Sequence, residues 1–284
     1  MTSETGSGLP ASLKAAWGFE DRPAKGPKPG LSLDRIVQAA VRIADTEGLG
    51  AVSMSKVAAE VGVTAMALYR YVGNKGELLA LMVDAALGDP PEVPRPGQGW
   101  RAGLAEWGWA EGAAYRRHPW GPRAPIAGLP MLPHQVAWMD RGLRCLAGTD
   151  LSEQHKLSAI LLISNLVRSY VMLEFDLRSV TEGAAGSGDP MAGFASLARL
   201  ISPERFPALV AAFASGALDD ADPMDDELGF GLERVLDGIE TLIAQAASGA
   251  GRNPVSRAAS SPVAGAASSP AFGAASSPAE GTAE

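Results

Sequence analysis

Apolar residues recur at the three-to-four-residue spacing of amphipathic helices along most of this chain. The first such pattern follows Ser32, a residue type that caps helix N-termini, and it stops at Gly48, a residue type that ends helices. The pattern predicts a helix from about residue 33 to 47. Its buried face should consist of Ile36, Val37, Ala40, Ile43 and Ala44.

The stretch that follows predicts two short helices joined by a tight turn. Ser53 can cap the first helix and Gly62 can end it, while Thr64 can cap a second helix running from Ala65 to about Val72. Two short helices in this arrangement form a helix-turn-helix, the unit that reads DNA. The inward-facing residues should be Val57, Ala58 and Val61 in the first helix, and Leu68 and Val72 in the second.

A further helix should begin at Lys75, because Asn74 and Glu77 form a capping-box-like pair, and it should reach about Leu87. At this position the positive side chain and the exposed backbone amides can point at the same phosphate. A solvated surface charge is the alternative interpretation of Lys75.

Helical periodicity continues through the second half, so the sequence predicts an all-α fold. One of the expected helices should bury the stripe Val136, Met139, Leu143 and Leu146, with Trp138 beside it. Asp150 and Glu153 form a possible capping box for the longest one. The expected helices span residues 100–118, 133–146, about 151–179, about 191–200, 203–217 and about 225–247.

Changes in composition divide the chain into five parts. A segment with four prolines and three glycines separates two helical regions and cannot stay helical. The predicted parts are a flexible basic arm (1–30), a three-helix DNA-binding domain (31–88), a linker (89–99), a larger helical bundle for ligand binding and dimerisation (100–249) and a tail (250–284).

The two ends of the chain carry different signals. The arm is rich in Gly, Pro, Ser and Thr and places Lys25 and Lys28 just ahead of the first helix. These lysines can lie in a minor groove or along phosphates, or the arm can be a solvated linker. The tail repeats an octapeptide three times (AASSPVAG, AASSPAFG and AASSPAEG) and is predicted to be disordered, with no function legible.

The net charge of -8 is distributed unevenly. Residues 1–80 carry nine Lys or Arg against eight Asp or Glu, whereas the remainder carries 15 against 24. The acidic excess therefore lies away from the predicted DNA-binding end. It should also discourage indiscriminate binding to nucleic acid.

Secretion, membrane insertion and metal binding are not expected. Cys145 is the single cysteine and cannot form an internal disulfide, which fits a reducing cytoplasm. Residues 1–30 have no apolar core of a signal peptide, and the most apolar run, residues 159–167, contains Ser164 and Asn165. No His or Cys cluster has the spacing of a metal site, so neither metal nor cofactor is predicted.

Several residues between Leu33 and Leu87 occur at the spacing found in a known family. The most specific part of this match is the segment LYRYVGNKGELL. By these residues the stretch resembles the N-terminal domain of the TetR family of one-component transcriptional repressors. The matching positions are Ile36, Ala40, Ala44, Gly48, Ser53, Val57, Ala58, Gly62, Val63, Leu68, Tyr69, Tyr71, Val72, Lys75 and Leu78.

The resemblance implies a set of DNA contacts. It implies that Thr64, Tyr69 and Lys75 bind phosphates; packing in the protein is the alternative for Tyr69. Bases would be met by the residues beside them on the second short helix. Ala and Met side chains lack a bidentate hydrogen-bonding head, so readout should depend on thymine methyl groups. The predicted DNA-binding residues are Ser53, Thr64, Ala65, Met66, Tyr69, Arg70, Lys75, Lys25 and Lys28.

The second half resembles, more loosely, the C-terminal domain of the tetracycline-repressor branch. The resemblance is carried by WRAGL at 100–104, RHPW at 117–120, the helix around residues 138–143 and FGLERVLDGIE at 230–240. It implies a small-molecule inducer held in a helical bundle and dimerisation through the last long helices.

A pocket of this kind needs apolar walls with a few polar or aromatic groups. Asn165 and Arg168 are polar residues in a very apolar helix, so they need a partner: a ligand, another buried side chain or the facing subunit. Ordinary core packing is the alternative for the aromatic and Met residues. The candidates are Trp107, Trp109, Tyr115, His118, Trp120, Met131, His134, Trp138, Met139, Asn165, Arg168, Tyr170 and Met172.

The last predicted helix carries one continuous apolar stripe. Together with the helix near residues 151–179, it could form a four-helix interface between two subunits. Packing within one subunit is the alternative. The stripe, and with it the predicted dimer interface, consists of Leu228, Leu232, Val235, Ile239 and Leu242, continued by Ala246.

Together these features predict a cytoplasmic homodimer that binds a palindromic double-stranded operator and is released by an apolar or aromatic effector. A DNA-binding dimer without an effector is the first alternative, and a fully packed C-terminal core would favour it. A helical-bundle enzyme is the second. No nucleophile elbow, phosphate loop, inward carboxylate pair or metal-spaced His set is found, so the protein is not expected to be an enzyme.

Overall fold

The computed structural model describes residues 11–19, 31–125, 131–183, 201–215 and 223–249, and it is all-helical over these ranges. The elements are α1 (Ala11–Ala16), α2 (Leu33–Glu47), η1 (Leu49–Ala51), α3 (Met54–Val61), α4 (Ala65–Leu68), α5 (Lys75–Leu87), α6 (Trp100–Arg117), η2 (Gly121–Arg123), α7 (Pro133–Cys145), α8 (Glu153–Gly183), α10 (Pro207–Ala214) and α11 (Pro223–Ala247).

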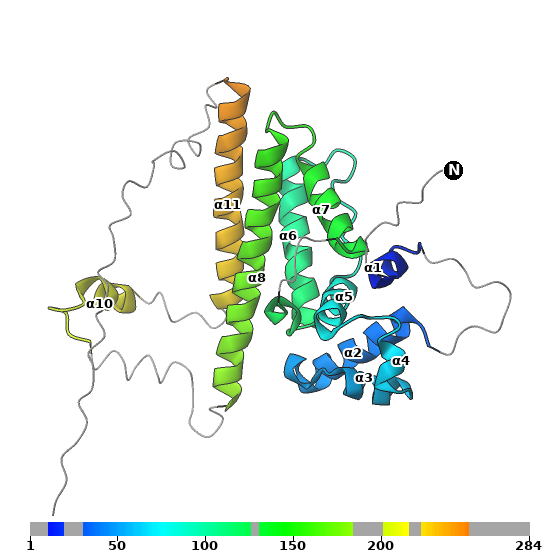
Figure 1. Ribbon diagram of the computed structural model, residues 1–284. Helices are drawn as coiled ribbons and strands as arrows, with labels where there is room; N and C mark the ends of the chain where they lie inside the picture. Colours follow the sequence, from blue (N-terminus) through cyan, green and yellow to red (C-terminus); the bar gives the residue numbers. More distant parts are fainter. Residues whose placement is uncertain (1–10, 20–30, 126–130, 184–200, 216–222, 250–284) are drawn as a thin grey trace, which may run out of the picture.

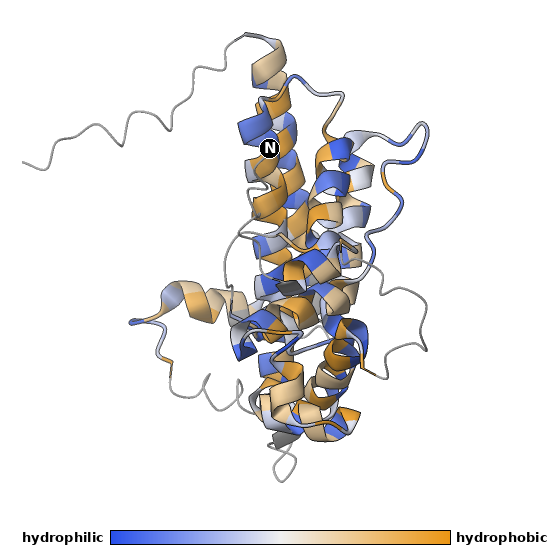
Figure 2. Cartoon of the chain, turned by 45° about the vertical axis from the view of Figure 1, so that its right-hand side comes forward, coloured by the Kyte–Doolittle hydropathy of each residue, from blue (hydrophilic) through white to orange (hydrophobic). Residues whose placement is uncertain are grey.

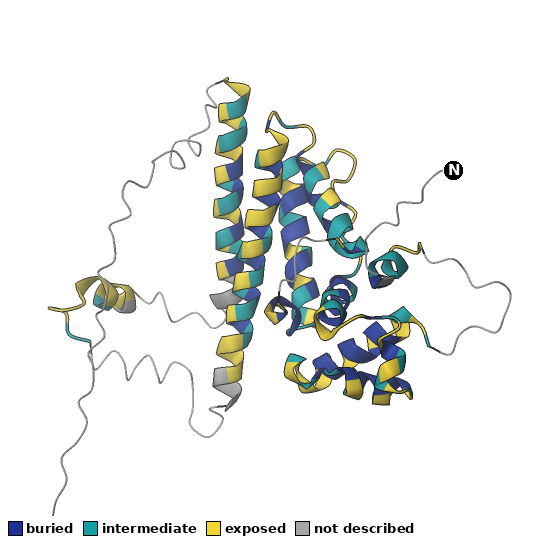
Figure 3. Ribbon diagram, viewed as in Figure 1, coloured by how far each residue is buried: buried dark blue, intermediate teal, exposed yellow. Residues whose placement is uncertain are grey.

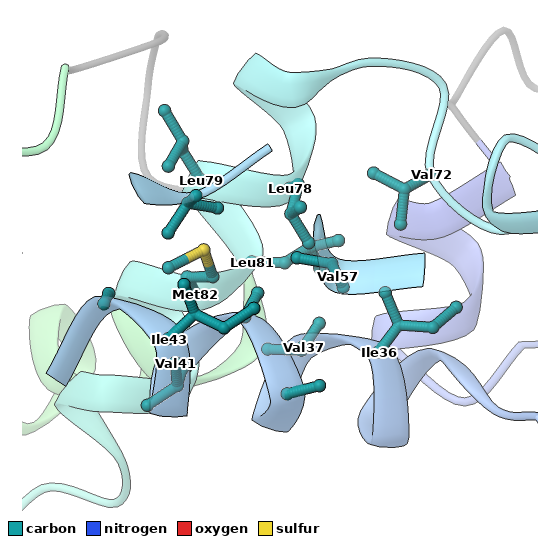
Figure 4. Close-up of a cluster of buried hydrophobic side chains, with 14 of the residues drawn as sticks. Ile36, Val37, Val41, Ile43, Val57, Val72, Leu78, Leu79, Leu81 and Met82 are labelled. Atoms are coloured by element: carbon teal, nitrogen blue, oxygen red, sulfur yellow. The ribbon is translucent and has the colours of Figure 1, made fainter. Parts of the chain in front are cut away.

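Helices α2 to α5 form a small head with its own hydrophobic core (Figure 4). The predicted helix caps of this head are confirmed: the side chains of Ser32, Ser53 and Asn74 accept bonds from the first turns of α2, α3 and α5. The core also includes Trp120 and Leu132 from the second half of the chain. Its fully buried members include Ile36, Val52, Val57, Leu68, Val72, Leu78 and Met82.

The second short helix is four residues long, so the predicted end near Val72 is wrong. The Leu68 carbonyl accepts bonds from the amides of both Tyr71 (2.8 Å) and Val72 (3.0 Å), which tightens the chain into a turn. The inward direction of Leu68 and Val72 is confirmed, because both are fully buried. Thr64 precedes the helix as predicted, but its side chain makes no capping bond.

The larger body consists of α6, α7, α8 and α11, with α8 and α11 side by side along one edge (Figure 1). Buried positions alternate with exposed positions along these helices (Figure 3), and hydrophobic residues alternate with hydrophilic ones along them (Figure 2). Helix α8 is long and apolar enough to cross a membrane by length and composition, a property that core helices of soluble proteins share. Here it packs against α6 and α11.

Two local predictions about the body are wrong. The amide of His155 bonds to the hydroxyl of Ser152, so Ser152 caps the start of α8 in place of the predicted Asp150. The buried face of α7 is rotated by about one residue from the predicted one, because Trp138, Gly142 and Cys145 are buried. Of the predicted stripe, Leu146 is buried and the other three residues are half-buried. A glycine faces the core here because a Cβ on Gly142 would lie 3.2 Å from the ring of Trp107.

Two short helices lie at the margins. The arm is not wholly extended: α1 packs its Leu13 and Ala16 against the head, and the indole of Trp17 donates to the Met131 carbonyl at 2.8 Å. Helix α10 lies apart from the body (Figure 1), and it starts later than predicted because turns at Ser202 precede Pro207. The segment predicted around residues 191–200 and the repeat tail are outside the described residues.

Candidate nucleic-acid interface and small-molecule site

Helix α4 is held by its inner residues and exposes the other side to solvent. Gly62 ends α3 with a φ of 76°, so the chain turns there, and the Val63 amide bonds back to the Ala58 carbonyl at 2.9 Å. The Met66 side chain is 75% exposed and that of Tyr69 is 47% exposed. Thr64 and Arg70 are exposed and Ala65 is half-buried, so the predicted reading residues share one accessible surface, the reading face.

Lys75 lies at the first position of α5, beside the reading face, and is exposed. The loop before it is fixed from both sides: Asn74 accepts from the Glu77 amide at 2.9 Å, and the Gly73 amide donates to the Glu77 carboxylate at 2.6 Å. The ammonium group of Lys75 is therefore carried on an ordered turn. Its binding of a phosphate remains a prediction.

Ser53 has a structural role that the sequence also indicated. Its hydroxyl accepts from the Lys56 amide at 3.2 Å and lies 3.3 Å from the Ser55 hydroxyl. Lys25 and Lys28, the other predicted DNA contacts outside α4 and α5, are outside the described residues.

Several cations of the head are engaged within the head itself. Arg42 pairs with Glu60 at 3.6 Å, and Lys56 pairs with Glu47. Within the described part of the chain, Arg70 has no ion pair, and the same is true of Lys75. Both side chains are exposed, and their predicted contacts with DNA stay predictions.

The head is joined to the body by polar contacts to Asp45 of α2. One carboxylate oxygen of Asp45 accepts from the indole N–H of Trp120 at 2.6 Å and lies 2.8 Å from Nδ1 of His118. Both side chains were predicted to line a pocket. In the structure they fix the end of α6 and η2 to the head, and their pocket role stays a prediction.

A second joint links α5 to α7 through Asp84, whose side chain is buried. Its carboxylate accepts from the Gln135 amide at 2.9 Å and lies 2.8 Å from Nδ1 of His134. Nearby, the indole of Trp138 donates to the Gly88 carbonyl at 2.8 Å. His134 and Trp138 were also predicted to line a pocket; in the structure these side chains connect the two parts, and their pocket role stays a prediction.

The remaining predicted pocket residues do not form one site. Trp107 is buried in the body core, while Trp109, Met131 and Asn165 are exposed; Asn165 bonds to the Leu161 carbonyl of its own helix. Met139, Tyr170 and Met172 are half-buried. Of the thirteen candidates, the structure brings Tyr115 and Arg168 together around a carboxyl group that the sequence analysis missed.

That carboxyl group belongs to Glu111, which is 5% exposed. Tyr115 donates to its Oε1 atom at a distance of 3.5 Å, and its Oε2 atom has no hydrogen-bond partner. Burial raises the pKa of Glu111 to about 7, and the Ser164 hydroxyl, Tyr115 and Arg168 lower it only in part. A signal was present in the sequence: Glu111 lies four residues from both Trp107 and Tyr115, on the apolar side of α6.

This raised pKa predicts a pH-dependent stability. The unfolded chain loses the Glu111 proton near pH 4.5 and the folded chain near pH 7, so rising pH should destabilise the fold across this window. The full effect is about 3 kcal/mol. We expect urea denaturation of Glu111→Gln to lack this component, so that its stability relative to the unchanged protein grows between these pH values and then levels off.

The matched control is Glu106→Gln, on the same helix, where an exposed pair with Arg95 holds the carboxylate. Its pH profile should parallel that of the unchanged protein. Parallel profiles for Glu111→Gln as well would show that Glu111 titrates normally.

Other sites gain no support among the described residues. No group of three His, Cys, Asp or Glu side chains is arranged to hold a metal ion in the described part. Cys145 is a buried free thiol, and burial raises its pKa to about 11. A shallow hollow contains none of the predicted pocket residues; it is lined by Leu143, Arg144, Ala147, Glu153 and Lys156.

The predicted dimer stripe of α11 is largely internal. Leu228, Leu232 and Ile239 are at most 4% exposed because they pack against α6 and α8 of the same chain, so their assignment to a subunit interface is wrong. Val235 and Leu242 are half-buried. Most of the exposed large apolar side chains of the body lie instead on α8, at Leu157, Leu161, Leu162, Leu173 and Leu177, and the others include Trp109 on α6 and Phe230 on α11.

Comparison with known proteins gives consistent matches to both halves. The family model "Bacterial regulatory proteins, tetR family" matches residues 36–82, and "Tetracyclin repressor-like, C-terminal domain" matches residues 93–243. The chain is 39% identical over 260 residues to the HTH-type transcriptional repressor DrrR1 of Streptomyces coeruleorubidus, which covers 86% of this chain and 90% of that protein.

Two further matches extend this comparison. The tetracycline repressor protein class E of Escherichia coli is 29% identical over 146 residues, 51% of this chain and 69% of that protein. The structure of the TetR family protein ActR of Streptomyces coelicolor, in complex with actinorhodin, matches with a TM-score of 0.63 and 29% identity. That match covers 78% of this chain and all of the ActR chain (100%).

Proposed function

This chain belongs to the tetR family of bacterial regulatory proteins, and we propose that it is a transcriptional repressor that binds a palindromic operator as a homodimer and is released by a small molecule. The observation that carries the proposal is the reading face. Its α4 side chains are exposed while Leu68 and Val72 fix the helix from within. We assign residues 31–88 to DNA binding, residues 100–249 to ligand binding and dimerisation, and the protein to the cytoplasm.

Dimerisation is proposed to use the outer face of α8. Leu157 and Leu161 form one i, i+4 pair and Leu173 and Leu177 form another, with exposed Asn165 and Ser169 continuing the same spacing between them. Exposed apolar patches of this kind mark interaction sites on soluble proteins. A second copy can cover this face by isologous packing, which is the usual geometry of a homodimer.

Pairing of two copies has a direct consequence for DNA recognition. Two reading faces bind successive major grooves only when they lie about 34–36 Å apart, one turn of the duplex. A ligand that favours another spacing weakens operator binding by its differential affinity for the two arrangements.

The proposed route of this change is α5, which packs against α2 of the head and against α6 and α7 of the body. Its two ends are tied to different partners. Lys75 begins the helix beside the reading face, and Asp84 near its other end binds the start of α7. Movement of α7 is therefore expected to tilt α5 and displace the reading face.

Phosphate binding predicts a specific salt dependence. Lys75→Ala should weaken binding to all DNA sequences, and the slope of log affinity against log salt should fall by roughly one for each phosphate that is no longer neutralised, about two per dimer. Tyr69→Phe, which removes one hydroxyl, should weaken binding less but as uniformly. Fluorescence anisotropy over a salt series measures both effects.

Arg144→Ala is the control, because Arg144 is an exposed cation of the body paired with Asp140, far along the chain from the head. It removes the same charge and should leave both quantities unchanged. An unchanged salt slope in Lys75→Ala would contradict the phosphate contact.

The α5 route predicts a further difference between two neighbouring aspartates. Asp84→Asn weakens a buried acceptor of two groups and should lower the free energy of unfolding by about 1–3 kcal/mol. It should also lower operator affinity, because the orientation of α5 is less well fixed. Asp89→Asn is the control: the Asp89 side chain is 95% exposed and lies 3.8 Å from His134. Loss of stability without any change in operator affinity would argue against this route.

The direct test of the function is an electrophoretic mobility shift with the intergenic DNA upstream of the gene, repeated with a panel of apolar aromatic compounds. Retardation that a compound reverses is the expected result. Retardation that no compound reverses would favour the dimer without an effector. Absence of retardation would exclude the proposed DNA-binding role at that site.

A further inference from the structure

One polar cluster of the body takes no part in the reading face, the joints or the exposed α8 face. It consists of Glu111 and Tyr115 on α6 and of Ser164 and Arg168 on α8. Glu111 is buried, whereas its three neighbours are half-buried. The Arg168 guanidinium donates to the Ala124 carbonyl at 3.1 Å, which fixes it beside η2.

The cluster has an unmet hydrogen-bonding demand. Within the described residues, Oε2 of Glu111 is the buried side-chain oxygen without a partner. Buried polar atoms are normally paired, and an unpaired one is destabilising. Arg168 lies near enough to influence Glu111, but it is held by Ala124 and forms no ion pair with the carboxyl within the described part of the chain. The described residues therefore leave Oε2 of Glu111 without a donor.

The neighbours of Glu111 include both apolar and polar side chains. Next to Glu111, a Cβ on Gly112 would lie 3.5 Å from Val167 and 3.6 Å from Leu228, at ordinary contact distance. The polar neighbours are the hydroxyl groups of Tyr115 and Ser164 and the guanidinium of Arg168. A molecule that fits both kinds of neighbour carries a polar group on an apolar body.

We propose that Glu111, with Tyr115 and Arg168 beside it, binds a hydroxyl group of a neutral and largely apolar effector, the hydroxyl donating its proton to Oε2 of Glu111. This assignment rests on the proposed function, since it names the ligand class of the repressor. A hydroxyl suits the cluster because it can donate to Glu111 while it accepts from Arg168 or Tyr115.

Charged ligands fit less well. A ligand ammonium group that reaches Glu111 also meets the guanidinium of Arg168, and a ligand carboxylate meets Glu111 itself. Like charges at such distances in a partly buried site oppose binding. The cluster therefore selects for neutral donors.

The test uses two neutral probes with the same skeleton, 2-naphthol and 2-methoxynaphthalene, which differ in the presence of the hydroxyl donor. Their dissociation constants are measured with the full chain by ligand-detected NMR titration at about pH 8.5, where the Glu111 carboxyl, whose pKa is raised to about 7, is ionised. We expect 2-naphthol to bind about tenfold more tightly or better, the value of one hydrogen bond to a charged or buried acceptor. Glu111→Leu, which removes the acceptor and keeps the volume, should reduce this ratio to near one.

Two further variants test whether the preference for 2-naphthol depends on an acceptor at position 111. Glu111→Gln keeps an acceptor in the same place and should retain part of the preference, and Glu106→Gln on the same helix should retain all of it. An equal affinity for both probes, a preference that survives in Glu111→Leu, or no binding of 2-naphthol would each overturn the assignment. Circular dichroism confirms that each variant is folded.

Failure of the broader function is recognised separately. Operator binding of the unchanged protein is measured without probe, and retardation of the operator DNA is expected. A chain that binds no operator DNA contradicts the repressor role, whatever the probe preference. Operator binding without a probe preference contradicts the assignment of Glu111 alone.

Discussion

Substitution of Leu161 by glutamate is expected to convert the proposed dimer into monomers and to lower operator affinity by about 100-fold or more. Leu161 is 62% exposed, at the centre of the apolar positions in the first half of α8. Its replacement should leave the fold of each subunit intact, because its side chain is not part of the core. Two covered carboxylates facing each other across a two-fold interface should prevent association. A monomer reads one half-site and loses the gain from simultaneous binding.

Size-exclusion chromatography with light scattering measures the oligomeric state, and fluorescence anisotropy with operator DNA measures the affinity. Leu209→Glu is the control, because Leu209 is a 41% exposed leucine on α10, apart from α8. It should remain dimeric. A Leu161→Glu protein that elutes as a dimer would move the interface to another face.

A substitution in the apolar stripe of α11 is expected to have a different effect from one on the outer face of α8. Ile239 is 4% exposed and packs within its own chain, so Ile239→Glu should unfold the body and not dissociate intact subunits. A monomeric or aggregated product from that variant would carry no information on the dimer. The test of the dimer therefore needs a substitution on the exposed face of α8, because a substitution in the core-facing stripe of α11 would unfold the subunit itself.

The head could be predicted almost completely from the sequence because its signals are local. Ser32, Ser53 and Asn74 cap helices through bonds to amides three residues ahead, and Gly62 supplies a left-handed turn. Such interactions depend on a few neighbouring residues. The exceptions were the side-chain cap of Thr64, which is not formed, and the length of α4, since the Leu68 carbonyl is shared between two amides in a way that composition does not reveal.

The body could be predicted only in outline, because periodicity shows that a helix has an apolar face but not what covers it. In α11 that face is covered by α6 and α8 of the same chain. In α8 apolar residues occur on the inner side, at Ile163 and Val167, and also on the outer side, at Leu161 and Leu173. A sequence with apolar residues on both sides does not state which side a second subunit covers.

The small-molecule site was the least predictable feature. Aromatic residues attracted the prediction, yet the indole groups of Trp120 and Trp138 are used as hydrogen-bond donors at the joints between head and body. The residue missed was the carboxylic acid Glu111, whose significance comes from burial among residues distant in the sequence. Burial of a single polar residue depends on tertiary packing, and a single sequence does not specify it.

Among these variants, the largest loss of stability is expected from a substitution in the core of the body. Trp107→Ala should lower the free energy of unfolding by about 3–5 kcal/mol. Trp107 is 2% exposed, its ring centroid lies 5.9 Å from that of Trp138, and its indole donates to the Trp138 carbonyl at 3.0 Å. Alanine would leave a cavity beside Gly142, where no side chain can fill the space, and it would also leave that carbonyl without its donor.

Trp109→Ala is the control. It makes the same change two residues along the same helix, at a less buried position. Trp109 is 37% exposed and touches Gly229 of α11, so its loss should cost about 1 kcal/mol. Urea denaturation followed by circular dichroism measures both variants at one protein concentration, since dimerisation makes stability depend on concentration. Equal losses would contradict the described packing of α6. We also expect Trp107→Ala to lower operator affinity. Trp107 holds α7 through its bond to the Trp138 carbonyl, and the first turn of α7 binds Asp84 of α5. A displaced α7 should therefore shift α5 and, with it, the reading face.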